Sequence, residues 1–229
     1  MSQFKHVNVI LLVILMSIFP FYGNAQVSQK RIKQVLKEAF VKYENVTEGK
    51  NASYIKELAL VDSSLFGIAV VTVDGELITE GDFNTMVSIQ SISKVFTLAQ
   101  VIEEQGPKAI EDKIGVDATG EVFNSITAIE RMKGKEINSF VNPGAIATTS
   151  LIMGEDSTAK WNNIKNSYSA FSGRELELNM PVYISEANDN LRNQAIAHLL
   201  LSYNRMYFDP VQATDIYTKQ CALNVNAKD

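Results

Sequence analysis

Four serine–lysine pairs share a spacing that suits nucleophilic catalysis. In the pattern Ser-x-x-Lys, both side chains lie on one face of a helix, so the amine comes within reach of the hydroxyl and can take its proton. A lysine in a partly desolvated pocket loses its own proton more readily and can then act as the base. The pattern occurs at Ser2/Lys5, Ser53/Lys56, Ser91/Lys94 and Ser157/Lys160. The spacing alone is a weak signal, because short patterns of this kind often arise by chance.

Ser91/Lys94 differs from the other pairs in its surroundings. It lies where the strand-like segment Met86–Gln90 gives way to an apolar helix. A serine there stands at a helix N-terminus, whose free N–H groups can hold an oxyanion. The alternative is that Ser91 only caps the helix and that Lys94 is solvated. The adjacent Ser93 is a poorer candidate, because it points elsewhere.

The composition limits the other kinds of chemistry. The chain has 2 histidines and 1 cysteine, so an internal disulfide is impossible and a His/Cys zinc cluster is excluded. His198 lies in an apolar run and is expected to be a satisfied helix histidine, and Cys221 is expected to be structural. The pair Ser157/Lys160 follows polar residues and predicts an exposed helix start. A net charge of −5 gives no cationic excess for nucleic acid.

The first residues have the pattern of an export signal. Met1–Ala25 has a basic start, an apolar run and a small-residue exit. We expect cleavage after Ala25, leaving 204 residues in a single domain, 26–229, with no membrane span. Export would place the protein in the periplasm or outside a bacterium.

Hydrophobic periodicity predicts an α+β domain. Lys30–Val46 has the three- and four-residue spacing of an amphipathic helix. Leu65–Val73 reads as a buried strand, Asp74-Gly75 as the positive-φ dipeptide of a tight hairpin, and Glu76–Glu80 as the return strand. A helical stripe over Val95–Ile102 then stops near Gly106-Pro107, and the rest of the chain is mostly helical.

Several motifs along the chain resemble those of the serine-dependent glutaminases, in the order in which that family has them. They are Gly49–Ala59, Leu65–Gly67 with Val71–Glu76, Ser88–Phe96, Gly115–Gly120 with Phe123–Ser125, Asn142–Ser150, Ser185-Glu186 with Arg192–Ala195, and Asp215–Cys221. The resemblance implies a β-lactamase/transpeptidase-like fold, with an antiparallel sheet flanked by helices and a helical subdomain. It also implies hydrolysis of the side-chain amide of L-glutamine to L-glutamate and ammonia. No metal, nucleotide or flavin cofactor is implied, and relatives commonly form homo-oligomers.

The resemblance also implies roles for single residues. Ser91 would attack the amide to form a γ-glutamyl ester, Lys94 would take the serine proton, and Tyr54 would line the pocket close to the serine. The residues that would hold the substrate, besides Ser91, are Asn142, Glu186, Asn193 and Tyr217.

This set suits a free amino acid, because a carboxylate can hold the ammonium while neutral donors hold the carboxylate and the amide. The alternatives are a surface carboxylate at Glu186, a turn residue at Asn142 and a core aromatic at Tyr217.

Two features depart from the family pattern. Pro143 stands where the family usually has alanine, and we expect it to restrict Asn142 to extended conformations. The family also continues past Asp229 with a helix and strands that carry a second tyrosine and an oxyanion-hole N–H. Because losing one such donor typically costs about a hundred- to a thousand-fold in rate, we expect the 229-residue chain to be inactive or poorly folded.

Two other functions remain open. A penicillin-recognising acyl-serine enzyme would share Ser-x-x-Lys, and Ser202-Tyr203-Asn204 superficially resembles the second motif of that class. The motifs around Tyr54, Asn142 and Tyr217 favour the glutaminases instead. A non-catalytic remnant that binds glutamine is the alternative from a different class.

Overall fold

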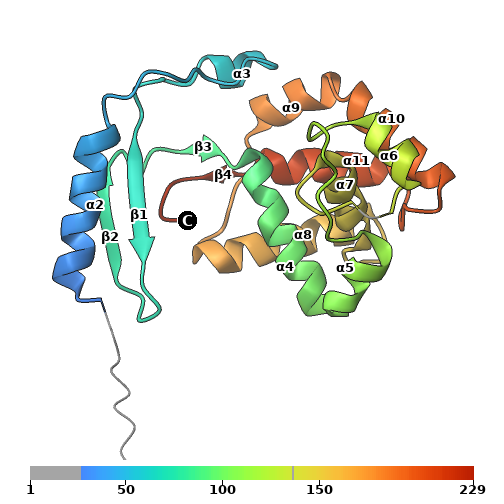
Figure 1. The fold of residues 1–229 in the computed structure, drawn as a ribbon, viewed down its shortest axis with the longest axis horizontal. Helices are drawn as coiled ribbons and strands as arrows, with labels where there is room; N and C mark the ends of the chain where they lie inside the picture. The colour runs from blue at the N-terminus through green and yellow to red at the C-terminus, as the bar shows by residue number, and fades with distance from the viewer. Residues whose placement is uncertain (1–26, 136) are drawn as a thin grey trace, which may run out of the picture.

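The computed structural model describes residues 27–135 and 137–229, so the predicted export signal lies outside the described residues. The helices are α2 (Gln29–Tyr43), α3 (Lys56–Ala59), α4 (Ser93–Gln105), α5 (Pro107–Lys113), α6 (Ile126–Met132), α7 (Asn142–Leu151), α8 (Ser157–Ser172), α9 (Met180–Asn188), α10 (Leu191–Ser202) and α11 (Pro210–Cys221), with a short 3₁₀ helix at Gln90–Ile92. The strands are β1 (Gly67–Val71), β2 (Leu77–Gly81), β3 (Val87–Ser88) and β4 (Asn224–Val225). Figure 1 shows α2, β1 and β2 at one side of the molecule and a body of helices at the other. The α+β class is therefore confirmed.

Helix α2 forms where the periodicity predicts it and packs against the hairpin of β1 and β2. The hydroxyl of Ser28 caps its first turn by accepting a hydrogen bond from the N–H of Arg31 at 3.3 Å. Near the other end, the ring of Phe40 stacks on Phe66 with the ring centroids 5.3 Å apart. We refer to α2, β1 and β2 together as the N-terminal lobe.

The hairpin is present, but two of its predicted details are wrong. Thr72 and Glu76 close a three-residue loop, in which only Gly75 has positive φ (82°), so Asp74-Gly75 is not a two-residue turn. Strand β1 is half-buried along most of its length and exposed at Val71, although the apolar run predicts a buried strand. The reason is that, within the described residues, β1 pairs only with β2 and no further strand or sheet covers it.

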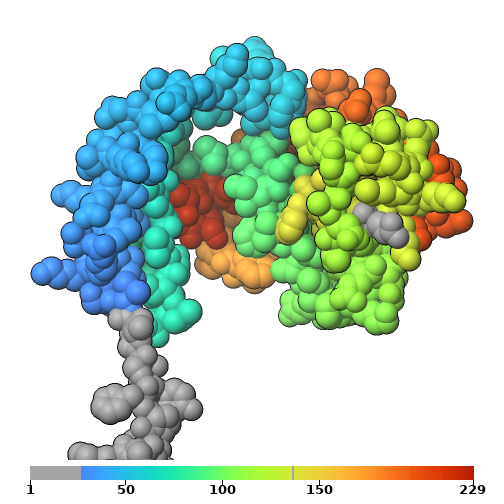
Figure 2. All heavy atoms as spheres, in the orientation of Figure 1, coloured from blue at the N-terminus to red at the C-terminus, as the bar shows by residue number. Residues whose placement is uncertain are grey.

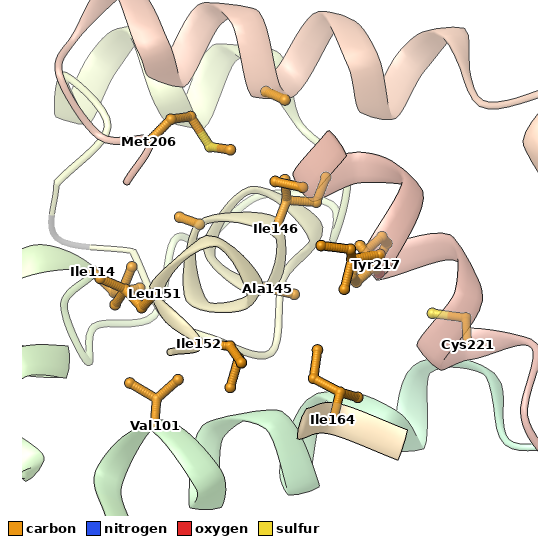
Figure 3. Packing of buried hydrophobic residues seen from close by; sticks show 14 of the residues in the cluster. Val101, Ile114, Ala145, Ile146, Leu151, Ile152, Ile164, Met206, Tyr217 and Cys221 are labelled. Atoms are coloured by element: carbon orange, nitrogen blue, oxygen red, sulfur yellow. The ribbon is translucent and has the colours of Figure 1, made fainter. Parts of the chain in front are cut away.

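The core of the helical body is built around α7. Every residue of α7 is buried, and α4, α10 and α11 pack against it. Figure 3 shows α7 nearly end-on, with Val101 of α4, Ile164 of α8 and Tyr217 of α11 directed at it from different sides. The small side chains of α7 allow the neighbouring helices to approach it closely, and the hydroxyls of Thr148, Thr149 and Ser150 hydrogen-bond to carbonyls within the helix, so all of its sides can be buried.

Helix α4 begins and ends at the predicted places. It starts at Ser93, directly after the 3₁₀ helix, and it ends before Gly106, whose φ of 80° lets the chain turn into α5 at Pro107. The apolar stripe is only partly buried, because Val101 is fully covered while Val95 is 50% exposed.

A second small sheet connects the C-terminal segment to the strand before Ser91. β3 pairs antiparallel with β4, placing Ser88 opposite Asn224, and the N–H of Ile89 donates to the carbonyl of Leu223 at 2.9 Å. The side chain of Asp229 forms an ion pair with Arg174, which follows α8. In Figure 1 this segment lies between the N-terminal lobe and α4.

Of the helices in residues 27–135 and 137–229, none is long and apolar enough to cross a membrane.

Candidate active site

A polar pocket of about 440 Å³ opens where the 3₁₀ turn before α4 and the first turns of α7 and α10 meet α9 and α11. Its volume suits a small ligand such as a free amino acid. Six of the seven residues predicted for the site line it: Tyr54, Ser91, Asn142, Glu186, Asn193 and Tyr217. The seventh, Lys94, lies beneath the pocket and contacts Asn142. The structure therefore brings together residues that are far apart in the sequence.

Ser91 is exposed to the pocket and lies in the 3₁₀ turn that leads into α4. The residue before it, Gln90, has a φ of 50°, a left-handed conformation that is unusual for a residue with a side chain. Local strain of this kind is often found at functional sites, where the surrounding structure maintains it. The predicted change from strand to helix at Ser91 is confirmed, with β3 on one side and α4 on the other.

Lys94 is almost fully buried, with 4% of its surface exposed, so it is not the solvated lysine of the alternative interpretation. Its Nζ donates a hydrogen bond to Asn142 Oδ1 at 2.8 Å. Burial lowers the pKa of Lys94, and the nearby Cys221 thiol only partly opposes this shift. This shift favours the neutral amine, which is the form that can accept a proton.

Asn142 connects three of the surrounding helices through its side chain. Its Oδ1 accepts from Lys94 of α4 and, at 3.2 Å, from the Tyr217 hydroxyl of α11. Its Nδ2 donates to Asn193 Oδ1 of α10 at 3.1 Å. The expectation that Pro143 holds Asn142 extended is wrong, because Asn142 is the first residue of α7. A proline in the first helical turn removes an N–H that has no partner there, so it fits without displacing the asparagine.

Glu186 and Tyr54 form the opposite wall of the pocket. The Tyr54 hydroxyl lies 2.7 Å from Gln90 Oε1 and 3.2 Å from Glu186 Oε1. Burial raises the pKa of Glu186, and hydrogen bonds from Tyr54 and Gln90 partly counter this. The pKa of Tyr54 is also raised, by burial and by the adjacent Glu186 carboxylate, so the hydroxyl keeps its proton. The Glu186 carboxylate is the group on this wall that can pair with a ligand ammonium.

Gln90 is a site residue that the sequence reasoning missed. It lines the pocket, approaches Tyr54 through Oε1, and donates through Nε2 to the Ser88 hydroxyl at 3.0 Å. The available signal was its position directly before Ser91 in the Ser88–Phe96 motif. The pocket also has residues at its mouth that were not predicted, among them Asp189 and Arg192.

The remaining candidates lie outside the site or only border it. Lys160 was expected at an exposed helix start, but it is buried, and its Nζ donates to the carbonyl of Ile152 just after α7. His198 is on a helix as expected, and its side chain is exposed. Cys221 is buried as expected, and burial raises its pKa to about 12. Within the described residues, no group of three or more His, Cys, Asp or Glu side chains could hold a metal ion.

The arrangement defines a class of protein: an α+β chain with a Ser-x-x-Lys pair at the start of a core helix and an amino-acid-sized polar pocket above it. The sequence model of the glutaminase family matches residues 49–229. The chain belongs to the glutaminase family.

Individual relatives agree with this assignment. A glutaminase of Colwellia psychrerythraea is 51% identical over 201 residues, covering 88% of this chain and 65% of the relative, and one of Brucella abortus is 48% identical, with 88% and 64% covered. Among solved structures, the probable glutaminase YbaS has a TM-score of 0.85 at 40% identity. The match covers 87% of this chain and 65% of YbaS. A structure described as Mglu in its glutamate form has a TM-score of 0.78 at 31% identity, with 86% of this chain and 46% of that one covered.

The chain spans slightly less than two thirds of the length of the curated relatives that it matches. The penicillin-recognising alternative has no comparable support, since the family match extends over the motifs around Tyr54, Asn142 and Tyr217.

Proposed function

We propose that this pocket binds L-glutamine and that Ser91 attacks its side-chain amide, with Lys94 as the base. The observation that carries the proposal is the buried Lys94, whose Nζ is held by Asn142 beneath a pocket to which Ser91 is exposed. Desolvation favours the neutral amine, which is the form that accepts a proton.

Glutamine recognition follows from the charges around the pocket. The Glu186 carboxylate pairs with the substrate ammonium, while Asn193 and the tyrosine hydroxyls donate to its carboxylate. Asn142 Nδ2 and the N–H groups at the start of α4 lie near the amide end. Support for a ligand of this size and charge comes from the related structure described in its glutamate form.

The proposed reaction has two steps. In the first, Ser91 Oγ bonds to the amide carbon and Lys94 Nζ takes the hydroxyl proton; the C–N bond then breaks as the nitrogen takes this proton from Lys94 and leaves as ammonia. In the second, water attacks the γ-glutamyl ester and gives a proton to Lys94; the ester bond then breaks as Ser91 Oγ takes this proton from Lys94, and L-glutamate leaves. Both steps balance with one water consumed, without any other reactant.

The test is release of ammonia from L-glutamine by the purified chain and by Ser91→Ala. A matched control is Ser157→Ala, which alters another Ser-x-x-Lys pair at the start of α8, outside the pocket. We expect activity to fall at least a thousand-fold in Ser91→Ala and to be unchanged in the control. Ammonia release that is detectable and equal in Ser91→Ala and in the unaltered chain would exclude Ser91 as the nucleophile.

Two further measurements test the pocket without depending on turnover. Calorimetric titration with L-glutamate detects a pocket that binds without turnover, and intact mass spectrometry after exposure to glutamine detects a trapped γ-glutamyl ester on Ser91. A covalent penicillin adduct at Ser91, without heat from glutamate, would favour the penicillin-recognising alternative.

We also propose that Met1–Ala25 directs export and that the protein forms homo-oligomers. The first rests on the charge and hydropathy pattern of that segment, and the second on the family resemblance. Cell fractionation with N-terminal sequencing, and light scattering of the purified protein, test the two proposals separately.

A further inference from the structure

A buried polar cluster lies behind the pocket, where α4, α7, α8 and α11 meet. Its centre is Gln220 of α11, which is 0% exposed although glutamine is usually found at protein surfaces. Its other members are Ser93, Thr97, Thr149 and Tyr168, each no more than 2% exposed. None of the five lines the pocket. A buried amide lowers stability unless both of its ends have partners, so its contacts indicate what it does there.

The Gln220 side chain makes contacts with two neighbouring helices at once. Its Oε1 lies 3.0 Å from the Thr97 hydroxyl of α4 and 3.2 Å from the Thr149 hydroxyl of α7. Its Nε2 donates to the Ser93 hydroxyl of α4 at 3.5 Å. One side chain of α11 therefore fixes the position of α4 at two points and of α7 at a third.

Tyr168 of α8 extends the cluster to the backbone of α4. Its hydroxyl donates to the carbonyl of Ser93 at 2.5 Å and lies 2.6 Å from the Thr97 hydroxyl. Ser93 and Thr97 flank Lys94 along α4. The first turn of α4 is therefore held by polar contacts from α8 and α11 on the side away from the pocket.

The three helices that Gln220 joins are those that carry the hydrogen-bonded group beneath the pocket. Lys94 is on α4, Asn142 on α7 and Tyr217 on α11, one turn before Gln220. Their side chains meet at Asn142 Oδ1 at 2.8 and 3.2 Å. Figure 3 shows Tyr217 of α11 beside α7. A small shift of one helix against the others would lengthen both hydrogen bonds.

We propose that Gln220 is a positioning residue for the reaction, which holds α4, α7 and α11 in register so that Lys94 Nζ stays on Asn142. The proposal rests on the proposed function of the pocket. It concerns how the three helices are held relative to one another, which can be tested without turnover. Apolar packing alone tolerates sliding, whereas hydrogen bonds at both ends of a buried amide do not.

The test variant is Gln220→Met, which keeps the length of the side chain and removes both of its polar ends. We expect kcat to fall about tenfold to a hundredfold, since misplacement by about 1 Å costs up to that much, while KM changes less than threefold. We also expect the Lys94 pKa to rise towards that of an ordinary lysine, because Nζ becomes hydrated. NMR titration of ¹³C-labelled lysine, with Lys94→Arg for assignment, measures this pKa without any turnover.

A second pair of variants removes a single hydroxyl each. Thr149→Val deletes one contact of Gln220, whereas Thr214→Val deletes a buried hydroxyl of α11 that bonds only to the carbonyl of Pro210. We expect Thr149→Val to reproduce the rise in the Lys94 pKa in part, and Thr214→Val to leave it unchanged. If Gln220→Met fails to fold, this pair decides the question.

The outcomes separate the two proposals. Loss of thermal stability in Gln220→Met, with kcat and the Lys94 pKa as in the unaltered chain, would overturn the positioning role. If the unaltered chain neither binds L-glutamate nor releases ammonia, the proposed function fails, and the Lys94 titration still decides on Gln220. A raised Lys94 pKa in Gln220→Met and Thr149→Val, absent in Thr214→Val, supports the positioning role in either case.

Discussion

At the scale of single residues, the burial of Lys94 links the chemistry of the pocket to the stability of the fold. Desolvation lowers its pKa, so the folded protein binds this proton more weakly than the unfolded chain does. The shift that suits Lys94 to the proposed role of base therefore destabilises the protein at any pH where lysine would otherwise be charged.

This reasoning predicts the pH dependence of a Lys94→Met variant. The free energy of unfolding of the unaltered protein rises with pH between the lowered pKa of Lys94 in the folded state and its ordinary value of about 10.4 in the unfolded state. Near neutral pH, we expect Lys94→Met to be more stable by on the order of 1 kcal/mol, and the difference to shrink as the pH approaches 10. Urea unfolding at several pH values measures it.

The matched control is Lys37→Met, which replaces an exposed lysine of α2. We expect no comparable gain in stability from it. A Lys94→Met protein that is less stable than the unaltered chain at neutral pH, by an amount independent of pH, would contradict the argument from burial.

Most of the pocket could be predicted from the sequence, because the residues lie in recognisable motifs. The burial of Lys160 could not, since the polar residues before it favour exposure. Its side chain is covered only because α8 begins beside the end of α7, where two carbonyls accept from its Nζ. Gln90 was missed because neither its φ nor its contact with Tyr54 has a local pattern in the sequence.

At the scale of elements, Gly144 allows the first turn of α7 to lie against the chain before it. A Cβ at this position would lie 1.9 Å from the carbonyl oxygen of Asn138, a distance that no real contact allows. The position of α7, and with it that of Asn142, therefore depends on residue 144 having no side chain.

We predict that Gly144→Ala destabilises the protein by roughly 2–3 kcal/mol, as overpacking in a well-packed interior does. It should also weaken L-glutamate binding, because Asn142 moves with the turn. Gly49→Ala is the control, since a Cβ there has no neighbour within 4 Å. Thermal unfolding and calorimetry check the two effects, and a Gly144→Ala protein as stable as the control would show that the turn can relax.

Within the N-terminal lobe, Gly81 has a similar role between β2 and α2. Its φ is 67°, and an added Cβ would lie 2.2 Å from the carbonyl oxygen of Phe66 and 2.3 Å from the ring of Phe40. Gly75 has a comparable φ of 82° but open space around it. The two glycines therefore separate the effect of backbone conformation from that of crowding.

We expect Gly75→Ala to cost about 1 kcal/mol through the left-handed conformation alone. Gly81→Ala should cost at least about 2 kcal/mol more, because the Phe66 carbonyl and the Phe40 ring must also move away from the new side chain. Urea unfolding followed by far-UV circular dichroism compares the two variants. Equal losses would mean that these crowded atoms yield without penalty.

The periodicity of α2 and α4 was sufficient to place both helices, and Gly106 marked the end of α4. The hairpin loop was harder to predict, since a two-residue and a three-residue turn both use the glycine after Asp74. What separates them is the pairing of Thr72 with Glu76, which depends on the register of the strands.

At the scale of the whole molecule, the N-terminal lobe and the helical body differ in how completely they are packed. Every residue of α7 is buried, whereas Ile78 alone is buried in β1 and β2. Figure 2 shows an opening between the lobe and the helical body, with the C-terminal segment at its edge. The incomplete burial of the hairpin could not be predicted from the sequence, because the apolar run of β1 suggests a buried strand.

We therefore predict unequal hydrogen exchange. Amides of β1 and β2 should exchange through local opening, at least tenfold faster than those of α7, which should exchange only when the body unfolds. Mass spectrometry of peptic fragments measures both, and the peptide of α11 provides a second buried reference. Equal protection in the hairpin and in α7 would show that the lobe and the body unfold as one unit.

The β3–β4 pair has a consequence for how the pocket responds to strain. β3 leads directly to Ser91, and β4 follows the helix that carries Tyr217, so backbone hydrogen bonds tie these two walls of the pocket together. The helix that carries Glu186 is tied to the same segment, because the N–H of Asn179 donates to the carbonyl of Ala222 and the N–H of Asn224 donates to the carbonyl of Glu177, each at 2.8 Å. A force on the C-terminal segment would therefore reach Ser91, Tyr217 and Glu186 together, so that these walls move as one unit and the length of side chain that fits between them is preserved.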